Sequence, residues 1–456
     1  MSGLNGIMDT GLSALFSAQA GLATTGHNIA NASTPGYSRQ QVMFAARRPR
    51  YTSDGAIGRG VEVASIRRVQ DEFLADNMRV QNSRLESYTA VDASLYEIEA
   101  ILGSVDNDHL GDALNKFFNS WNGLAQPPVN PNLKQNVVAA ATSLVQDFHG
   151  INDNLDNLEK NLNESVASEI GNLNRLLTAV AELNKQIMQA EVGGNPANDL
   201  RDQRDQLVLE VSGMAAVTVL EREDGSKDLI MSGRTIVTRG SVTRLDTREI
   251  VENGSSRMMV VAGDSLREVA LSTGRIEGLL TSRDVHVTQA RDLLDKVAAR
   301  IIAEVNALHT QGRTATSSGL AFFTGDSMHT IAVNTTLVDQ PSLVATGRSI
   351  NESDNALALE LANLGNVSAL DPNGDTVLEV YRSAVVSVAS NRASYEFMVD
   401  NQQNVIDSLV AKVASVSGVS LDEEGANMVK YQNGYNAAAR VISAVQEMYD
   451  TLLNMV

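Results

Sequence analysis

The chain has 456 residues, and its 36 lysine and arginine residues against 55 aspartate and glutamate residues give a formal net charge of −19. So acidic a chain cannot release counterions from a phosphate backbone over a large face, which excludes a general nucleic-acid binder. The lack of cysteine excludes disulfides, thiolate zinc sites, iron–sulfur clusters and a thiol nucleophile. At about 150 residues per domain, the length predicts roughly three domains.

The first thirty residues are predicted to form an amphipathic helix. Asp9 is the only formal charge before residue 32. Apolar positions recur there at alternating steps of four and three, the heptad pattern of a helix that packs along one stripe. The candidate contact residues, called the N-terminal seam, are Leu12, Leu15, Leu22 and Ile29.

The last thirty residues carry the same pattern more completely. The candidate contact residues, called the C-terminal seam, are Met428, Tyr431, Tyr435, Ile442, Val445, Tyr449 and Leu452. Chain ends usually fray unless something holds them, so two amphipathic termini are expected to pair with each other, with other subunits, or with both. The alternative is a pair of ordinary core helices in one globular domain.

The middle of the chain contains a long helical pattern. Two helices are expected between residues 88 and 124, followed by a reversal at Pro127 and Pro128. From Val137 to Ile187 apolar residues then recur at helical spacing without a strong helix breaker. At 1.5 Å per residue, a helix of about fifty residues is about 75 Å long, which is rod-like rather than globular. It is expected to stop at residues 193–196, Gly-Gly-Asn-Pro.

After a shorter helix at 198–213, the apolar period changes from that of a helix to that of a strand. Residues 214–271 contain short β-branched runs, which predict a small antiparallel β-domain. The expected turns are Asp224-Gly225, Ser232-Gly233, Arg239-Gly240 and Asn253-Gly254. Helical patterns return at about 274–309 and 378–416, separated by a polar, irregular stretch.

These elements predict a mainly α protein with a β insertion. It should combine discontinuous terminal coiled-coil helices, a long helical rod domain and a small antiparallel β-domain. The expected limits are 1–45 with 415–456 for the terminal coiled coil, 46–212 with 273–414 for the rod, and 213–272 for the β-domain. The rod is therefore expected to form from segments far apart in the sequence.

The sequence offers no positive case for an enzyme. The six histidines are scattered and none forms a pair of metal-ligand spacing, so we predict no catalytic residue, no cofactor and no metal site. The only basic cluster is expected to be a solvated face rather than a DNA groove. Its members are Arg47, Arg48, Arg50, Arg59, Arg67 and Arg68.

The sequence also lacks the patterns of a membrane span and of a secretory signal peptide. No run of 18 or more apolar residues predicts a membrane span. The first positively charged side chain is Arg39, so the N-terminus lacks the charged start of a secretory signal peptide. We expect a protein that does not bind a membrane and that uses another route if it leaves the cytoplasm.

The most specific string is NIANASTPGYSRQQVMF at 28–44. Asn31 can end the preceding helix, and Pro35-Gly36 can occupy the centre of a type II turn because glycine tolerates positive φ. Tyr37 then follows the turn at a fixed position. This string, with GRGVEVASIRRVQDEFL at 58–74 and the ending at 417–453, resembles the signatures of the axial proteins of the bacterial flagellum.

Details within these motifs are similar to the hook-associated members of that family, which lie at the junction of hook and filament. They are YSRQ at 37–40, NPANDLRDQRDQLVLEVS at 195–212 and DEE at 422–424, together with the long helical pattern. The motifs cover about a third of the chain. Gly425 and Gly434 depart from the expected alanine, which costs up to about 1 kcal/mol per position in a helix.

The resemblance implies a structural adapter that joins the flagellar hook to the filament. It implies terminal helices in the inner layer of a tube, self-association in a ring, and contacts with the hook protein and with the second hook–filament junction protein. It also implies secretion through the flagellar type III apparatus to an extracellular position, with a cytosolic export chaperone on the C-terminal helix. The assembly residues would be the two seams with Asn31, Pro35, Gly36 and Tyr37.

Three alternatives stay open at this point. The nearest is another flagellar axial protein, such as a hook subunit or the second junction protein. A secreted wall-cleaving hydrolase would need convergent carboxylates, and the β-insert offers only scattered ones such as Asp224, Asp228 and Asp246. An adhesin module in the β-insert is the third.

Overall fold

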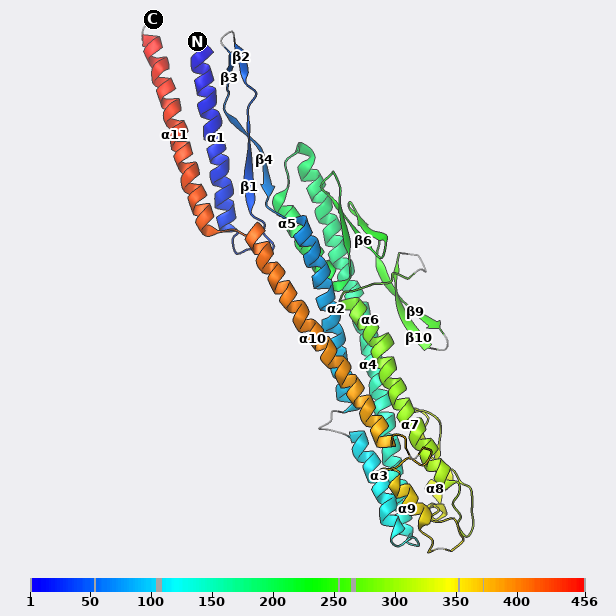
Figure 1. The fold of residues 1–456 in the computed structure, drawn as a ribbon. Coiled ribbons are helices and arrows are strands. Elements are labelled where there is room, and N and C mark those ends of the chain that lie inside the picture. The colour runs from blue at the N-terminus through cyan, green and yellow to red at the C-terminus, as the bar shows by residue number, and fades with distance from the viewer. Residues whose placement is uncertain are drawn as a thin grey trace.

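The computed structural model describes residues 2–52, 55–103, 109–252, 255–263, 268–351, 353–371 and 373–454. It is 65% helical and strongly elongated, with both termini at one end (Figure 1). The predicted fold class, long helices with a small antiparallel β insertion, is confirmed.

Helix α4 (Pro131–Ala190) is the rod. Its 60 residues correspond to about 90 Å. Asn130 caps its N-terminus by accepting a hydrogen bond from the N–H of Asn132, and Pro131 at the first position loses no helical hydrogen bond. The predicted apolar stripe is buried from Val137 to Ile187, so the periodicity located the helix correctly and missed only the six residues before this stripe and the three after it.

The half of the rod distant from the termini packs in a helical bundle. Its partners include α2 (Glu72–Leu102), α3 (His109–Ala125), α7 (Thr288–His309), α9 (Ala356–Asn363) and the start of α10 (Val377–Ser417). Short elements of the irregular stretch close this end (Figure 1): β11 (Phe323–Thr324), β12 (Ala332–Val333), α8 (Thr335–Asp339) and a 3₁₀ turn at Pro341–Leu343. An aromatic cluster around Phe117, Trp121 and Phe322 fills the centre.

His309 is buried in this cluster as a neutral ring. It is 1% exposed, its Nδ1 lies 2.7 Å from the carbonyl oxygen of Leu320, and its Nε2 accepts the N–H of Ala345 at 3.3 Å. One ring nitrogen therefore donates and the other accepts, which only the neutral imidazole can do. Burial lowers the pKa of His309 to about 4.

We expect the free energy of unfolding to fall as the pH drops through the range of His309. The unfolded chain binds the proton first, so the contribution is complete above about pH 6.5 and is lost progressively toward pH 4, up to roughly 3 kcal/mol. Urea unfolding at about pH 7.5 and about pH 4.5 should show the loss in the native sequence and a smaller loss in His309→Gln. The control is the exposed residue His329, since His329→Gln should keep the native pH dependence. An equal loss in both variants would contradict this role.

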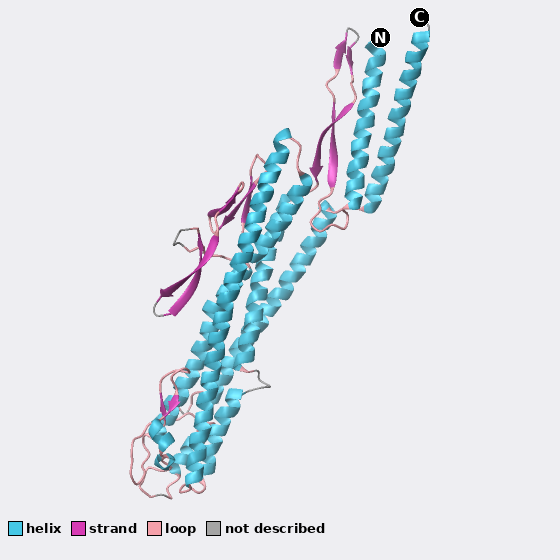
Figure 2. Cartoon of the chain, turned by 180° about the vertical axis from the view of Figure 1, so that it is seen from behind, coloured by secondary structure: helices cyan, strands magenta, loops and turns pink. Residues whose placement is uncertain are grey.

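The other half of the rod carries the β insertion on one side (Figure 2). Strands β5 (Thr218–Glu221), β6 (Lys227–Met231), β7 (Arg234–Thr238) and β8 (Ser241–Val242) form an antiparallel sheet in chain order, and β9 (Leu245–Glu252) pairs with β10 (Ser255–Ala262). The turn at Ser232-Gly233 has positive φ at both residues, 49° and 75°, as a tight hairpin requires. The expected turn Asn253-Gly254 lies outside the described residues.

Two asparagines of α4 hold the insertion on the rod. The side chain of Asn174 donates to the carbonyl of Leu245 and accepts its N–H, at 2.8 and 2.9 Å. The buried Asn184 accepts the N–H of Lys227 and donates to the carbonyls of Lys227 and Arg239. Each amide side chain satisfies strand groups that would otherwise be buried without a partner, which fixes the position of the sheet.

Helix α2 begins at Glu72, 16 residues before the expected start at 88, and the other long helices agree with the predicted ranges. Residues 275–309 form α6 (Arg275–Thr281), a π-helical segment at Ser282–Val287, and α7. Helix α10 begins in a capping box between Thr376 and Glu379, and Gly418 ends it. Helix α11 (Leu421–Asn454) then continues to the C-terminus, and α1 (Ser2–Ala30) begins the chain.

Strands at 40–68 were not predicted. Strand β1 (Gln40–Ala46) pairs with β4 (Val61–Arg68), and β2 (Arg50–Thr52) pairs with β3 (Gly55–Ile57), so the segment is a long hairpin beside α1 (Figure 1). Val42 is the only residue of β1 that is buried, so the strand lacks the apolar alternation that would reveal it in the sequence. The hairpin crosses the expected domain limit at residue 46.

Candidate assembly interface

The two chain termini form an antiparallel helix pair, α1 with α11 (Figure 1). The C-terminal seam faces α1: a Cβ placed on Gly21 would lie 2.6 Å from the ring of Tyr431, and one on Gly11 would lie 3.1 Å from Ile442. The hydroxyl of Tyr449 hydrogen-bonds the side chain of Asn5. Met428, Tyr435 and Ile442 are half-buried, Val445 is buried, and Leu452 stays 46% exposed.

Helix α1 meets α11 through small residues rather than through the N-terminal seam. Gly11, Ala18 and Gly21 contact α11, and Asn28 donates to the carboxylate of Glu424 at 3.2 Å. These positions form one heptad stripe next to the predicted one. Of the two apolar seams that the sequence predicts, the C-terminal one packs on α1, while Leu15, Leu22 and Ile29 of the N-terminal one are half-buried.

The N-terminal seam therefore lies on an open side of α1. Leu12 is 37% exposed, and Leu15, Leu22 and Ile29 are half-buried. Phe16, on the same side of the helix, is 63% exposed. The hairpin packs on a side of α1 that adjoins α11: the N–H of Val61 lies 3.3 Å from the hydroxyl of Ser13, and the ring of Phe44 lies near that of Tyr431. On its remaining side α1 keeps an apolar face, with Leu12 and Phe16 exposed, that its own chain covers only in part.

The close approach at Gly21 leads to a prediction. In Gly21→Ala the new methyl must displace the Tyr431 ring, which also packs near Phe44, with ring centroids 6.3 Å apart. We expect α11 to lose about 1–3 kcal/mol of local stability, measured as faster hydrogen exchange over residues 428–445. Gly26→Ala is the matched control, because nothing lies within 4 Å of a Cβ there. Equal exchange in both variants would show that the pair is not closely packed.

The turn after α1 has the predicted geometry. Asn31 donates from its side chain to the carbonyl of His27, ending the helix, and the N–H of Tyr37 lies 3.2 Å from the carbonyl of Thr34. Gly36 has φ = 77°, as the third position of a type II turn requires. The turn directs Tyr37 back onto α1, where its hydroxyl donates to Asn28 at 2.7 Å.

The Tyr37 hydroxyl is kept in its neutral form, in which it donates a hydrogen bond to Asn28. Burial and the nearby carboxylates of Asp199, Asp202 and Glu424 raise the pKa of the Tyr37 hydroxyl well above its usual value. The same Asn28 oxygen accepts the N–H of Gln40 at 2.9 Å, and its NH₂ donates to the carbonyl of Gln40. Asn28, 1% exposed, thus links α1, the turn and β1.

The turn also joins the terminal helices to the rod. Arg39 pairs with Glu423 and with the buried Glu424 of α11, both at 2.8 Å. The N–H of Ser38 donates to Asp202 of α5 (Asn198–Met214) at 3.0 Å. Two strings that carried the family resemblance, at 37–40 and 195–212, are therefore in direct contact although about 160 residues separate them.

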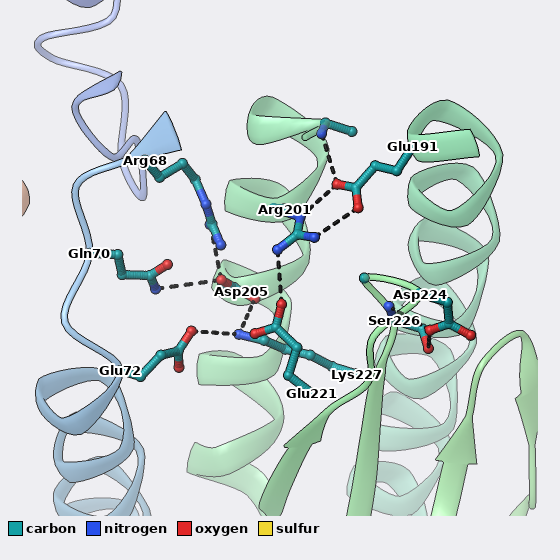
Figure 3. Close-up of polar contacts among 12 residues, drawn as sticks. Arg68, Gln70, Glu72, Glu191, Arg201, Asp205, Glu221, Asp224, Ser226 and Lys227 are labelled. Carbon is teal, nitrogen blue, oxygen red and sulfur yellow. Dashed lines mark hydrogen bonds and ion pairs between the residues drawn. The ribbon is translucent and has the colours of Figure 1, made fainter. Parts of the chain in front are cut away.

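A buried charge cluster lies beneath this contact (Figure 3). Arg68 donates to Asp202 at 2.8 Å and to Asp205 at 3.0 Å, and Asp205 also accepts Lys227 of β6 at 3.0 Å. Burial alone would raise the pKa of the Asp205 carboxyl, but Lys227, Arg204 and Arg68 outweigh it and hold that pKa well below its usual range. We call the region where the terminal helices meet the rod the joint. The joint cluster consists of Arg68, Asp202, Arg204, Asp205 and Lys227.

A second cluster fixes the start of α5 against the end of α4 (Figure 3). Arg201 donates to both oxygens of Glu191, at 2.7 and 2.8 Å, and to Glu221 of β5 at 2.9 Å. Glu191 also accepts the N–H of Ala197. Rod, β insertion and hairpin thus meet at α5, and α5 connects them to the terminal pair.

Sequence reasoning missed most of these residues. Arg68 was assigned to a solvated basic face, and this is wrong, because its side chain is 7% exposed and paired with two carboxylates. Its neighbour Arg67 is exposed, and only the strand register distinguishes the two. The available signal was the regular spacing of Asp199, Asp202 and Asp205 on α5, which puts carboxylates on one side of a helix.

Among the described residues, no group of three histidine, aspartate or glutamate side chains is placed to hold a metal ion. Asp228 pairs with Arg222, and Asp224 with Arg239 at 3.1 Å. The searched residues contain one stretch, Val377–Asn454, with a window apolar enough to cross a membrane by length and composition, and 17% of that window is buried. Its mean hydropathy is 1.2.

Comparisons with known proteins agree with this architecture. The family model for the helical domain of flagellar hook-associated protein FlgK matches residues 95–323, half of the chain. Those for the flagellar basal body rod protein and for the C-terminal region of the rod proteins FlgEFG match residues 8–37 and 412–455, the two terminal helices. These matches define the class: the chain is an axial protein of the bacterial flagellum, a structural component rather than an enzyme.

Within that class, the chain belongs to the family of flagellar hook-associated protein FlgK. It is 27% identical to flagellar hook-associated protein 1 of Bacillus subtilis, over 98% of this chain and 97% of that one. It is 25% identical to the Salmonella typhimurium protein, over 99% and 100%. The fold is similar to that of the flagellar hook junction protein FlgK from Burkholderia pseudomallei, with a TM-score of 0.63 at 13% identity, over 75% of this chain and all of that one.

Proposed function

We propose that this protein is the adapter that joins the flagellar hook to the filament, and that the open apolar face of α1 and the outer face of α11 are its assembly surfaces. The observation that carries the proposal is the partly exposed apolar face of α1, where Leu12 is 37% and the neighbouring Phe16 63% exposed, in a helix pair that packs through small residues. An apolar stripe left open on a terminal helix stabilises contacts with neighbouring subunits. Asn31, Pro35, Gly36 and Tyr37 set the angle between that pair and the rod.

The proposed partners follow from the position of such an adapter. The hook protein would contact one side, the second hook–filament junction protein the other, and copies of this chain would associate in a ring. A head-to-tail contact that does not close on itself gives a helical assembly, so the same helices must accept unlike neighbours above and below. The apolar window in Val377–Asn454 fits these subunit contacts, and we propose no membrane contact.

The route to this position is part of the proposal. We propose export through the flagellar type III apparatus to the outside of the cell, with a cytosolic chaperone on α11 before export. Only Glu424, Ala438 and Val445 of α11 are buried among its described residues, so the helix offers most of its surface to such a partner. The three-part division at 1–45 with 415–456, 46–212 with 273–414, and 213–272 remains our proposed domain description.

Deletion tests the function directly. Cells without the protein should keep intact hooks, lack attached filaments and release filament subunits into the medium. Reintroducing the native sequence should restore filaments. Loss of the hooks would favour the alternative, a hook subunit, and normally attached filaments would contradict an adapter role altogether.

A further inference from the structure

The hairpin at 40–68 has the composition of a binding surface. It contains six arginines, of which Arg68 is buried in the joint cluster, no lysine and only two carboxylates, Asp54 and Glu62, in a chain of net charge −19. Its exposed apolar side chains include Phe44 at 40%, Tyr51 at 81% and Ile57 at 56%. Aromatic residues, methionine and arginine are enriched at protein interfaces, and lysine and glutamate are depleted.

The outer part of this hairpin borders an open cleft. The cleft, of about 450 Å³, lies between the hairpin and the terminal helices, and its apolar lining includes Ile7, Ile57 and Val441. Arg50 and Arg59 lie at the same cleft. Arg50 is exposed, and Arg59 reaches Asp9 only at 4.0 Å, so both guanidinium groups are accessible to a partner. We call this surface the arginine cleft.

A surface of complementary chemistry lies on α10. Phe397 is 68% exposed, and Glu396 and Asp400, both exposed, flank it. Between residues 393 and 411 the helix has three carboxylates and no lysine or arginine. Arg392, just before this stretch, is engaged with Glu99 at 2.8 Å. We call Glu396, Phe397 and Asp400 the carboxylate face.

The two surfaces cannot meet within one chain. The carboxylate face lies about 30 Å from the end of α10 at the joint, since some twenty residues separate them at 1.5 Å each. The arginine cleft borders β2 and β3, which Figure 1 shows at the outer end of the hairpin, beyond the joint in the other direction. About ten residues of extended strand separate them from the joint, which corresponds to about 30 Å. A contact between them therefore requires a second copy, displaced along the long axis.

We propose that the arginine cleft of one copy binds the carboxylate face of a second copy of this chain. Phe397 enters the cleft between Ile57 and Val441, and Glu396 and Asp400 pair with Arg59 and Arg50. The charge complementarity of a basic arm and an acidic rod selects this occupant and fixes the axial displacement. The inference rests on the proposed assembly of several copies at one junction and gives that assembly a specific contact.

The absence of native cysteine makes the contact testable by disulfide formation. Cells would express two versions together, Arg50→Cys and Asp400→Cys, and isolated junctions would be mildly oxidised. We expect a covalent dimer of the two versions. The control pairs Arg50→Cys with Leu220→Cys and should give no dimer. Leu220 is an exposed residue of β5, which pairs with β6, and Figure 1 shows β6 on the other side of α4 from α10. Junctions that contain both versions without a dimer would overturn the contact and leave the proposed function intact.

A charge exchange provides an independent measurement. Arg59→Glu and Glu396→Arg should each reduce the number of attached filaments at least about tenfold, and the two changes in one chain should restore it. Single variants without effect, or a double variant that stays defective, would overturn the pairing. Absence of the protein from junctions in native cells would instead contradict the proposed function itself.

Discussion

Replacing Asp205 by alanine should cost about 3–5 kcal/mol at the joint cluster, the largest loss of stability that we expect from one substitution. Its carboxylate neutralises Lys227, Arg204 and Arg68, whose side chains are 1%, 0% and 7% exposed. Without it, three cations remain buried with too few counter-charges, and burying an uncompensated charge is more costly than losing an attractive contact.

The effect should be local to the joint. Hydrogen exchange of the amides in α5 should become about 100-fold faster or more, the rate change that corresponds to the lost free energy. Fluorescence of Trp121, which lies in the distant aromatic cluster, should report an unchanged unfolding midpoint there. The matched control is Asp199→Ala on the same helix. The side chain of Asp199 is 60% exposed, so its removal should lower the local stability of α5 by less than about 1 kcal/mol. Similar exchange in the two variants would show that the cluster does not hold the joint.

Replacing Leu12 by aspartate should abolish assembly while leaving the monomer folded. Leu12 is 37% exposed in the single chain, so the substitution should change monomer stability by less than about 1 kcal/mol. In the assembly the same carboxylate would be buried on the open face of α1 at a cost of several kcal/mol, which corresponds to a loss of binding of at least about 100-fold.

Two measurements separate these effects. Circular dichroism of the purified variant should match the native sequence, and cells that carry it should form hooks without filaments. Val338→Asp is the control, because Val338 is 47% exposed on α8 at the opposite end of the molecule and should be tolerated. Motile cells with Leu12→Asp would contradict the proposed role of the N-terminal seam.

The elements that the sequence predicted are those with strong local signals. Helix α4 combines a sustained apolar period, a proline at its first position and a glycine pair at its end. The β insertion shows paired turn residues between β-branched runs, and Pro35-Gly36 forms the expected turn. These signals depend on neighbouring residues, so tertiary contacts were not needed to interpret them.

The features that were missed depend on long-range pairing. The contact face of α1 consists of Gly11, Ala18 and Gly21, which carry little hydrophobic signal and were passed over for the adjacent leucines. Arg67 and Arg68 are chemically identical in the sequence, and only the pairing of β4 with β1 turns Arg68 toward α5. Ser38 and Asp202 meet only because the chain runs away from the terminal helices along α2 and returns to them along α4.

The central claim is that the open face of α1 is covered by neighbouring subunits at the junction. Its most direct test is the accessibility of a single cysteine at Phe16, in a chain that has none of its own. The cysteine of a Phe16→Cys variant should react with a maleimide in the free monomer. In isolated hook–filament junctions this reaction should be at least about tenfold slower, as expected for a side chain that is buried on assembly. Equal reactivity in the monomer and in the junction would contradict the account.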